Sequence, residues 1–484
     1  MTMRAFKPHR KCLRAAAFGV AVLALSAGTG RAQTVDSSLG PLRTETFAID
    51  QSAAPVPARR STTPADVEEA STNRAVGRYP EDDAPLRATR ENERAAPIEG
   101  RARRAEAGPY EPLGLRLGTF VATARLDQGL GWTSNANASP TKQSSLFSES
   151  RLRLDAVSDW SRHEARLSLN GLYRRSLSGE RIAEAEGAID GELRLDLANE
   201  IDGLLALGYR VRPESPTSPS AIAGVRSRPL RHTFTGRGEL SRSLGLLNAK
   251  LRGELVRQIF EDATLTDGTV VSQADRDSTL ATAALRLGYE ISPALRPFIE
   301  VEAGRRIFDE KRDSAGYGRS ADRYALRAGL EIDLREKWSG EFSAGWLTER
   351  PDDDRLEAIS GFAAGGRLAW SPVRGTVVEL SGSTEVEGTT AAGESGALLY
   401  TSSLSVSRDL LSNLTARALI GVDLRNYSGS RARDLVFRGE ASLTWWLNRF
   451  AGVTGRVEHE VQRSSLPGRD YEASSVYLGM TLQR

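Results

Sequence analysis

The chain has 484 residues, of which 39% are hydrophobic, 26% charged and 6% aromatic, with 65 basic against 63 acidic residues and a mean hydropathy of −0.37. Its longest apolar run, residues 15–27, has 13 residues, whereas a spanning helix needs about 20, so the sequence excludes a helical membrane protein. A membrane β-barrel is compatible with this hydropathy, because its strands carry an apolar residue only at every second position.

The first 32 residues are typical of a secretory signal peptide. Five basic residues between positions 4 and 14 precede the apolar run, and Gly30-Arg31-Ala32 supplies small residues for cleavage near Ala32. Without this segment the chain has 59 basic and 63 acidic residues, so it has no basic footprint for nucleic acid. The only cysteine, Cys12, lies in residues 1–32, and we therefore expect the exported protein to have no disulfide.

Residues 33–112 contain nine prolines in 80 residues, short apolar fragments and mixed charges. A stretch of this composition cannot bury enough apolar surface to fold. We expect a disordered periplasmic tail, and we favour that interpretation over a segment that recruits a partner.

From Leu113 onward apolar and polar residues alternate with a period of two. In residues 184–197, for example, Glu184, Glu186 and Asp190 lie between apolar residues. Runs of this kind are 11 to 14 residues long, whereas a soluble strand has about 5 or 6 residues and a tilted strand needs about 9 to 11 to cross a bilayer. The sequence therefore predicts an all-β transmembrane barrel over residues 113–484.

The number of these segments predicts the size of the barrel. Eighteen candidates begin near residues 118, 146, 164, 184, 201, 230, 247, 279, 296, 322, 339, 359, 376, 398, 414, 433, 451 and 472. Short connections alternate with long ones, notably 213–229, 261–277, 308–319, 349–358 and 388–396. This alternation is typical of an antiparallel up-and-down barrel with short periplasmic turns and long external loops, and we expect about 18 strands (16–18). Pro297 is the one proline inside a predicted strand, which suggests that the boundary there is misplaced.

The tryptophans support the same arrangement. All seven lie in a predicted turn or within about three residues of a strand end: Trp132, Trp160, Trp338, Trp346, Trp370, Trp445 and Trp446. Membrane barrels place aromatic residues in girdles at the two interfaces. Soluble sandwiches also have aromatic residues near turns, so this observation favours a membrane barrel without requiring one.

The sequence shows no pattern for catalysis or metal binding. The three histidines after the signal segment, His163, His232 and His459, are isolated from one another and have no cysteine partners. The acidic run Asp352-Asp353-Asp354 falls in a predicted external loop, where a solvated loop is favoured over a calcium site or a bridge to lipopolysaccharide. We expect no enzymatic activity, no cofactor and no metal.

Charged residues at alternate positions of the strands are the candidates for lining the lumen. They must face away from hydrocarbon, and eighteen strands enclose an interior too wide for side chains to fill, which predicts a water-filled lumen. The alternative is that these charges only neutralise one another. The candidates are Arg323, Arg327, Glu331, Asp333, Arg417, Asp423, Arg425, Arg438, Glu440, Arg456, Glu458 and Glu460.

Five segments of the barrel region carry a family resemblance: Gly114-Leu115-Arg116-Leu117-Gly118-Thr119-Phe120, Asp159-Trp160-Ser161-Arg162-His163, residues 284–293 (ALRLGYEISP), residues 320–334 and Leu368-Ala369-Trp370-Ser371-Pro372. With these segments the chain resembles the β-barrel porin type 2 family of Gram-negative bacteria. The order of the segments along residues 113–484 carries the resemblance. It implies an outer-membrane location and a porin-like role, and it supplies no substrate or site residues. The chain departs from the usual aromatic end of such barrels, because it closes on Leu482-Gln483-Arg484.

These observations predict passive diffusion of small hydrophilic solutes across the cell outer membrane. The alternative is a structural or surface-interaction protein with a plugged lumen. We expect outer-membrane lipid and lipopolysaccharide, the barrel-assembly machinery and small solutes as partners, and no nucleic acid.

The longest connections, 213–229 and 261–277, are expected to fold inward and narrow the lumen. The second is acidic, with Glu261, Asp262, Asp267, Asp275 and Asp277, and predicts a mild preference for cations if it lines the constriction. The barrel region as a whole has 48 basic and 49 acidic residues, so selectivity should be weak and local.

Overall fold

The computed structural model describes residues 109–197, 200–222, 224–334, 337–389 and 393–484. The predicted signal peptide (1–32) lies outside these ranges, as does the predicted tail (33–112) up to residue 108. Within the described ranges no helix has the length and hydropathy needed to cross a bilayer. The helix content there is one 3-10 turn, η1 (Ala274–Arg276).

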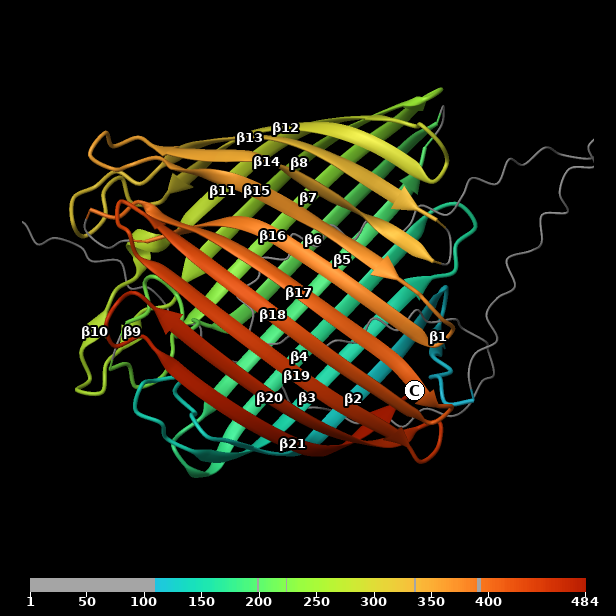
Figure 1. The fold of residues 1–484 in the computed structure, drawn as a ribbon, viewed down its shortest axis with the longest axis horizontal. Coiled ribbons are helices and arrows are strands. Elements are labelled where there is room, and N and C mark those ends of the chain that lie inside the picture. The colour runs from blue at the N-terminus through green and yellow to red at the C-terminus, as the bar shows by residue number, and fades with distance from the viewer. Residues whose placement is uncertain (1–108, 198–199, 223, 335–336, 390–392) are drawn as a thin grey trace, which may run out of the picture.

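The described residues form a closed antiparallel barrel of eighteen long strands (Figure 1). The wall consists of β2 (Phe120–Thr133), β3 (Ser145–Ser158), β4 (Glu164–Gly179), β5 (Ala183–Asp196), β6 (Ile201–Pro213), β7 (Leu230–Leu244), β8 (Leu247–Phe260), β11 (Ser278–Tyr289), β12 (Leu295–Phe308), β13 (Ala321–Asp333), β14 (Trp338–Pro351), β15 (Ile359–Trp370), β16 (Thr376–Gly388), β17 (Gly396–Leu411), β18 (Leu414–Ser428), β19 (Arg433–Trp446), β20 (Ala451–Ser464) and β21 (Tyr471–Gln483). Each strand pairs with its neighbours in sequence, and β21 pairs with β2 to close the ring.

Three short strands lie outside this ring of eighteen. β1 (Leu115–Leu117) pairs with the start of β2, and β9 (Ala263–Thr264) and β10 (Val270–Val271) form a small ribbon in the connection from β8 to β11. We call the two ends of the barrel the long-loop end and the short-turn end. β9 and β10 lie at the long-loop end, and β1 and the C-terminus lie at the short-turn end (Figure 1).

The predicted strands agree with the observed ones, because all eighteen begin within about two residues of the positions expected from the alternation. The suspicion that the boundary near Pro297 is misplaced is wrong, since β12 begins at Leu295 and includes this proline. Pro297 is paired with Leu330 of β13, whereas the ladder to β11 begins only at Phe298. Proline has no backbone amide hydrogen to donate, so it is tolerated near the end of a strand, where only one neighbouring strand is paired with it.

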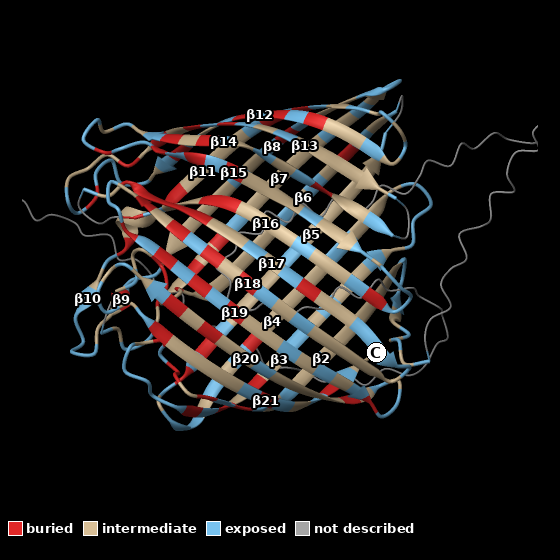
Figure 2. Cartoon of the chain, viewed as in Figure 1, coloured by how far each residue is buried: buried red, intermediate tan, exposed pale blue. Residues whose placement is uncertain are grey.

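The outer face of the wall is apolar. Leu207, Leu478 and Leu326 are 72%, 63% and 57% exposed, which is the arrangement of a surface in contact with lipid. Six of the seven tryptophans are exposed, and five of these lie at the ends of strands or in turns, whereas Trp346 lies within β14. Trp446 is buried and points inward. Buried residues are concentrated at the long-loop end of the barrel (Figure 2).

The ladder between β15 and β16 is incomplete. It pairs residues 366–370 with 378–382 and stops there, whereas β14 and β15 remain paired as far as Glu349 and Ile359. Beyond that point the ends of β16 and β17 lie inside the barrel, behind β15. Phe362 faces outward and is 51% exposed, so the adjacent Gly361 faces inward, and a Cβ at Gly361 would lie 2.6 Å from the Leu398 Cδ1. The glycine therefore makes room for a side chain of β17 inside the wall.

Candidate functional site: the lumen

The interior wall between β8 and β14 is covered by paired charges. Glu300 accepts hydrogen bonds from Arg252 Nη2 (3.0 Å), Arg286 Nε (2.9 Å) and Arg327 Nη1 (3.1 Å). Arg327 Nη1 also reaches Glu302 Oε2 (2.9 Å). These side chains come from four different strands, because alternate positions of each strand face the lumen. The network therefore joins neighbouring strands and neutralises most of its own charge.

A second network lies on the wall formed by β16, β18, β19 and β20. Arg438 donates from Nη2 to Asp423 Oδ2 (2.7 Å) and from Nε to Glu460 Oε2 (2.5 Å). Arg425 is held by both oxygens of Glu387. These are charge-assisted bonds between side chains that are at most 11% exposed.

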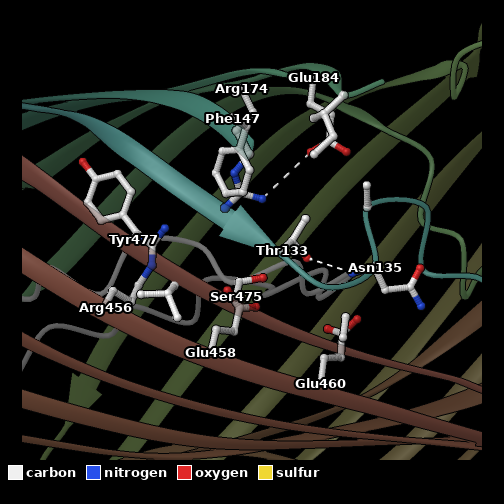
Figure 3. A pocket seen from close by; sticks show the side chains of 14 residues that line it. Thr133, Asn135, Phe147, Arg174, Glu184, Arg456, Glu458, Glu460, Ser475 and Tyr477 are labelled. Carbon is white, nitrogen blue, oxygen red and sulfur yellow. Dashed lines mark hydrogen bonds and ion pairs between the residues drawn. The ribbon is translucent and has the colours of Figure 1, made fainter. Parts of the chain in front are cut away.

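A third cluster borders a cavity of about 50 Å³ in the wall near the long-loop end (Figure 3). Beside the cavity the Glu149 carboxylate, which is 1% exposed, accepts from Arg174 Nε (2.8 Å), Arg456 Nη2 (2.9 Å) and Arg151 Nη2 (3.2 Å). The cavity is also lined by Glu458. It is large enough for a few water molecules and too small for most solutes.

Two carboxylates in this part of the wall lie near Arg456 but form no direct ion pair within the described part of the chain. Glu440 and Glu458 are directly opposite each other on β19 and β20. Neither side chain has a hydrogen bond or an ion pair within 4 Å to the described residues. An acidic pair of this kind attracts cations from the lumen, and its reach is about one Debye length.

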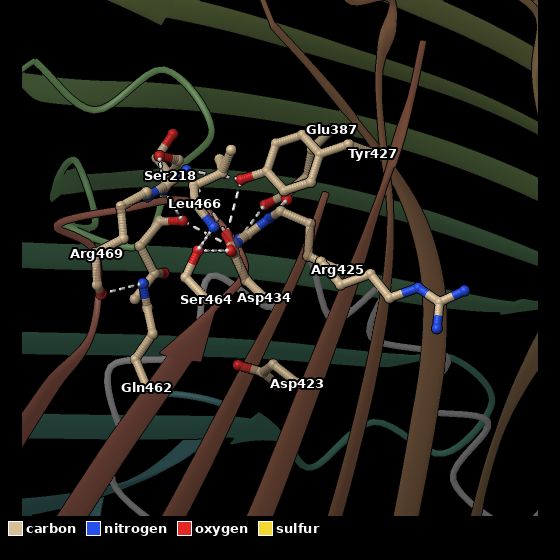
Figure 4. A network of polar contacts seen from close by, with 12 residues as sticks. Ser218, Glu387, Asp423, Arg425, Tyr427, Asp434, Gln462, Ser464, Leu466 and Arg469 are labelled. Atoms are coloured by element: carbon tan, nitrogen blue, oxygen red, sulfur yellow. Dashed lines mark hydrogen bonds and ion pairs between the residues drawn. The ribbon is translucent and has the colours of Figure 1, made fainter. Parts of the chain in front are cut away.

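The connection between β6 and β7, residues 214–229, crosses the lumen at the long-loop end. Arg425 of β18 donates to the Thr217 carbonyl oxygen (2.7 Å). Arg469, in the connection between β20 and β21, donates to the Ser218 carbonyl oxygen (2.7 Å; Figure 4). Since β18 and β20 lie on the opposite side of the ring from β6, the connection spans the opening rather than folding back over its own strands.

The contacts of this connection rest on a buried side-chain network. Asp434, which is 1% exposed, accepts from Tyr427 Oη (2.7 Å) and Ser464 Oγ (2.5 Å), and Arg469 Nη1 donates to Tyr427 Oη (2.8 Å; Figure 4). At the near side, Arg276 donates to Glu214 (2.5 Å). The connection is thus fixed at both sides of the opening.

The second long connection, residues 261–277, packs on the first one. The Arg226 amide donates to the Thr264 carbonyl oxygen (2.8 Å), and the Thr266 amide donates to the Gly224 carbonyl oxygen (3.0 Å). Its five predicted acids all have hydrogen-bond donors. Asp262 accepts from the Gln273 amide, Asp267 from the Thr269 amide and Asp277 from the Phe260 amide. Donors from other segments are the Ser314 amide for Asp275 and, if protonated, His232 Nε2 for Glu261. The bond from the Thr269 amide holds the pKa of Asp267 below its usual value. Whether these acids meet the permeating solute stays a prediction.

The twelve predicted lumen-lining residues lie at inward-facing positions of β13, β18, β19 and β20. Nine of them have ion pairs or hydrogen bonds to other side chains, two lack them, and Asp333 ends β13 near a short turn. The nine are Arg323, Arg327, Glu331, Arg417, Asp423, Arg425, Arg438, Arg456 and Glu460, and the two are Glu440 and Glu458. Their part in solute passage stays a prediction.

Other residues of the site were not anticipated. Glu149 belongs to an alternating run in β3 and could have been found from its period. The roles of Arg469 and Asp434 could not be predicted, because they depend on the 214–229 connection, which is distant in sequence. Within the described ranges no group of three or more His, Cys, Asp or Glu side chains is placed to hold a metal ion.

A closed antiparallel barrel with an apolar outer face and a charged interior defines an outer-membrane β-barrel. The chain belongs to the family described as "Putative beta-barrel porin 2", whose model matches residues 108–484. No curated protein matches the chain.

Solved structures with a similar fold are distant. The outer membrane protein opdK of Pseudomonas aeruginosa is 13% identical with a TM-score of 0.37, and the match covers 75% of this chain and 99% of that chain. OpdO of Pseudomonas aeruginosa is 12% identical with a TM-score of 0.37, covering 75% of this chain and 97% of that chain. The FrpB iron transporter of Neisseria meningitidis (F5-1 variant) is 8% identical with a TM-score of 0.35, covering 77% of this chain and 83% of that chain. At these TM-scores the similar structures carry no information about the solute of this protein.

Proposed function

We propose that the protein is a porin-like channel for passive diffusion of small hydrophilic solutes, with no catalytic step. The observation that carries the proposal is the lumen wall, where charged side chains face a space that eighteen strands keep too wide for side chains to fill. Such a surface favours water and polar solutes, and the family assignment supports the same class of function.

The narrowest part of this channel is expected at the long-loop end. There the 214–229 connection crosses the opening, and the ends of β16 and β17 lie inside the wall. Both features reduce the cross-section without a contribution from the short-turn end. We therefore place the constriction between these two elements, with the 261–277 connection behind the first of them.

The rival proposal is a structural or surface-interaction protein with a plugged lumen. The crossing connection favours it, because the hydrogen bonds from Arg425 and Arg469 fix residues 217 and 218 across the opening. Single-channel recording in planar bilayers separates the two proposals. A diffusion channel shows a stable open state in 1 M KCl, and a plugged barrel shows none.

The proposal includes export and assembly. Residues 1–32 would direct the chain across the inner membrane, and residues 33–112 would remain as a periplasmic tail. The barrel-assembly machinery would insert residues 113–484 among outer-membrane lipid and lipopolysaccharide. Protease protection of the tail in intact cells, and its loss after the outer membrane is permeabilised, would test this orientation.

A further inference from the structure

The seam between β15 and β16 is the weakest join in the wall. Residues 359–365 of β15 have no ladder partner on β16, although they are fully paired with β14 on the other side. An unpaired strand edge is costly in hydrocarbon, where no water can satisfy the backbone. A barrel that only needed stability would continue the ladder to the end of the strand.

The two strands diverge at a pair of glycines. Gly366 is opposite Gly382 in the last paired position, and Gly366 has φ +153°. A Cβ at Gly366 would lie 2.3 Å from the Glu341 carbonyl oxygen, so no other residue fits there without displacing β14. The backbone at the start of the seam is therefore one that only glycine adopts easily.

One side chain bridges the seam beyond these glycines. Thr384 Oγ1 accepts a hydrogen bond from the Ala364 amide (2.9 Å) and donates one to the Ala364 carbonyl oxygen (3.1 Å). It replaces the two backbone bonds that a ladder pair would make at this position. A hydroxyl is easily separated from these partners, because the strands themselves are not paired there.

The surface behind the seam differs from the rest of the lumen. Leu347, Ile359 and Leu398 are buried together with Ala325 and Ala363, and Val386 and Tyr400 pack against them. Leu347 has no exposed area and Ile359 is 2% exposed. An apolar surface of this kind supplies no polar contacts to an ion, but burial of an acyl chain or an aromatic ring against it is favourable.

From these observations we propose that the β15–β16 seam is a lateral gate through which small apolar or amphiphilic solutes pass between the lumen and the outer membrane. The structure shows its closed form, with Leu398 and Tyr400 filling the space behind β15. Opening breaks the two Thr384 bonds and moves the ends of β16 and β17 toward the lumen. The inference rests on the proposed function only in requiring that the lumen is open to solutes.

A disulfide across the seam tests this inference. The A364C/T384C pair lies at the bridging position, and the sequence has one other cysteine, Cys12, which precedes the predicted cleavage site. The probe is 1-N-phenylnaphthylamine, an apolar dye that fluoresces in membranes, added to intact cells that express the protein. Oxidation should reduce dye uptake to the level of cells without the protein, reduction should restore it, and KCl conductance of the purified barrel should not change.

The control is the A328C/A344C pair, whose residues are directly opposite each other in the complete β13–β14 ladder. Oxidation of this pair should leave dye uptake unchanged. Should the seam disulfide fail to form, T384V provides the second test, because it keeps the shape of threonine and removes its hydrogen bonds. We expect T384V to raise dye uptake by about thirtyfold, the shift in population that follows from losing two neutral hydrogen bonds of about 1 kcal/mol each.

The possible results are distinct. Unchanged dye uptake in the oxidised seam variant, or in T384V, overturns the gate. Loss of conductance together with dye uptake also overturns it, because the seam would then belong to the aqueous path. A wild-type protein without any conductance contradicts the proposed channel function instead.

Discussion

Replacing Glu149 by glutamine measures how strongly the buried ion pairs hold the barrel wall. The carboxylate is 1% exposed and is bound by Arg151, Arg174 and Arg456 from β3, β4 and β20. Removing one partner of a buried ion pair costs about 3–5 kcal/mol, because the other charge stays buried and uncompensated. Arg151 is still 19% exposed, and water in the lumen screens part of the effect, so we expect E149Q to lose about 3 kcal/mol of unfolding free energy.

The assay is equilibrium unfolding by guanidinium chloride in detergent micelles, followed by tryptophan fluorescence and by heat-modifiable gel mobility. The matched control is D352N, because Asp352 and its partner Arg305 are 45% and 44% exposed on the outer rim, where an ion pair contributes about 0–1 kcal/mol. The double variant E149Q/R456Q should be less destabilised than the sum of its single variants, since it removes one of the uncompensated charges. A loss below about 1 kcal/mol for E149Q would refute the argument and show that the lumen screens the network as bulk water does.

Three further predictions concern the lumen and its connections. Replacing residues 215–228 by a two-residue Gly-Ser turn should raise single-channel conductance. The turn can close because the Glu214 amide is 2.8 Å from the Pro229 carbonyl oxygen. An unchanged conductance would mean that this connection does not narrow the pore. The double variant Glu440→Gln with Glu458→Gln should lower the cation preference, measured as a reversal potential in a KCl gradient, and the effect should vanish near 1 M salt, where the Debye length is about 3 Å. The control is Glu331→Gln, because Glu331 is paired with Arg296. An equal effect of the control would contradict the role of the unpaired acids. Burial would raise the pKa of Asp313, but the backbone amide of Tyr317 and the Arg319 guanidinium outweigh it and hold the pKa below the usual 3.8. This carboxylate therefore stabilises the 309–320 connection above about pH 3.8 and loses that effect as the pH falls through its lowered pKa. Amide exchange in this connection, corrected for intrinsic rates, should accelerate below that pH in the wild type, and Asp313→Asn should exchange fast at every pH.

The strands could be predicted because the bilayer imposes a simple rule on them. In β13, Arg323 and Arg327 face inward while Leu326 faces outward, and a period-two pattern of this length is typical of a strand with lipid on one side and water on the other. The pairing of consecutive strands then follows from the connection lengths. The number of strands and the inward-facing side of each strand can therefore be predicted from the sequence.

The elements that narrow the long-loop end could not be predicted in the same way. The 214–229 connection has no periodic pattern, and its partners Arg425 and Arg469 lie more than 190 residues further along the chain. The pattern of β16 continues beyond Gly382 as if the strand stayed in the wall, but the ladder to β15 ends there and Leu398 of the neighbouring strand β17 lies behind Gly361. Both features depend on contacts across the lumen, and a rule about the lipid face contains no information about them.

The ion pairs and the seam are two aspects of one arrangement. Between β8 and β14, guanidinium groups such as Arg286 and Arg327 hold carboxylates of other strands, so neighbouring strands cannot separate without exposing several charges. Between β15 and β16 the described residues have one such pair, Arg367 with Glu379 (2.7 Å), and it lies within the part that is already laddered. Beyond Gly366 neither a ladder nor an ion pair joins the described residues of these strands, and Thr384 is the polar link that remains. Any opening of the wall would therefore begin at this seam, at the end of the barrel where we also propose the constriction.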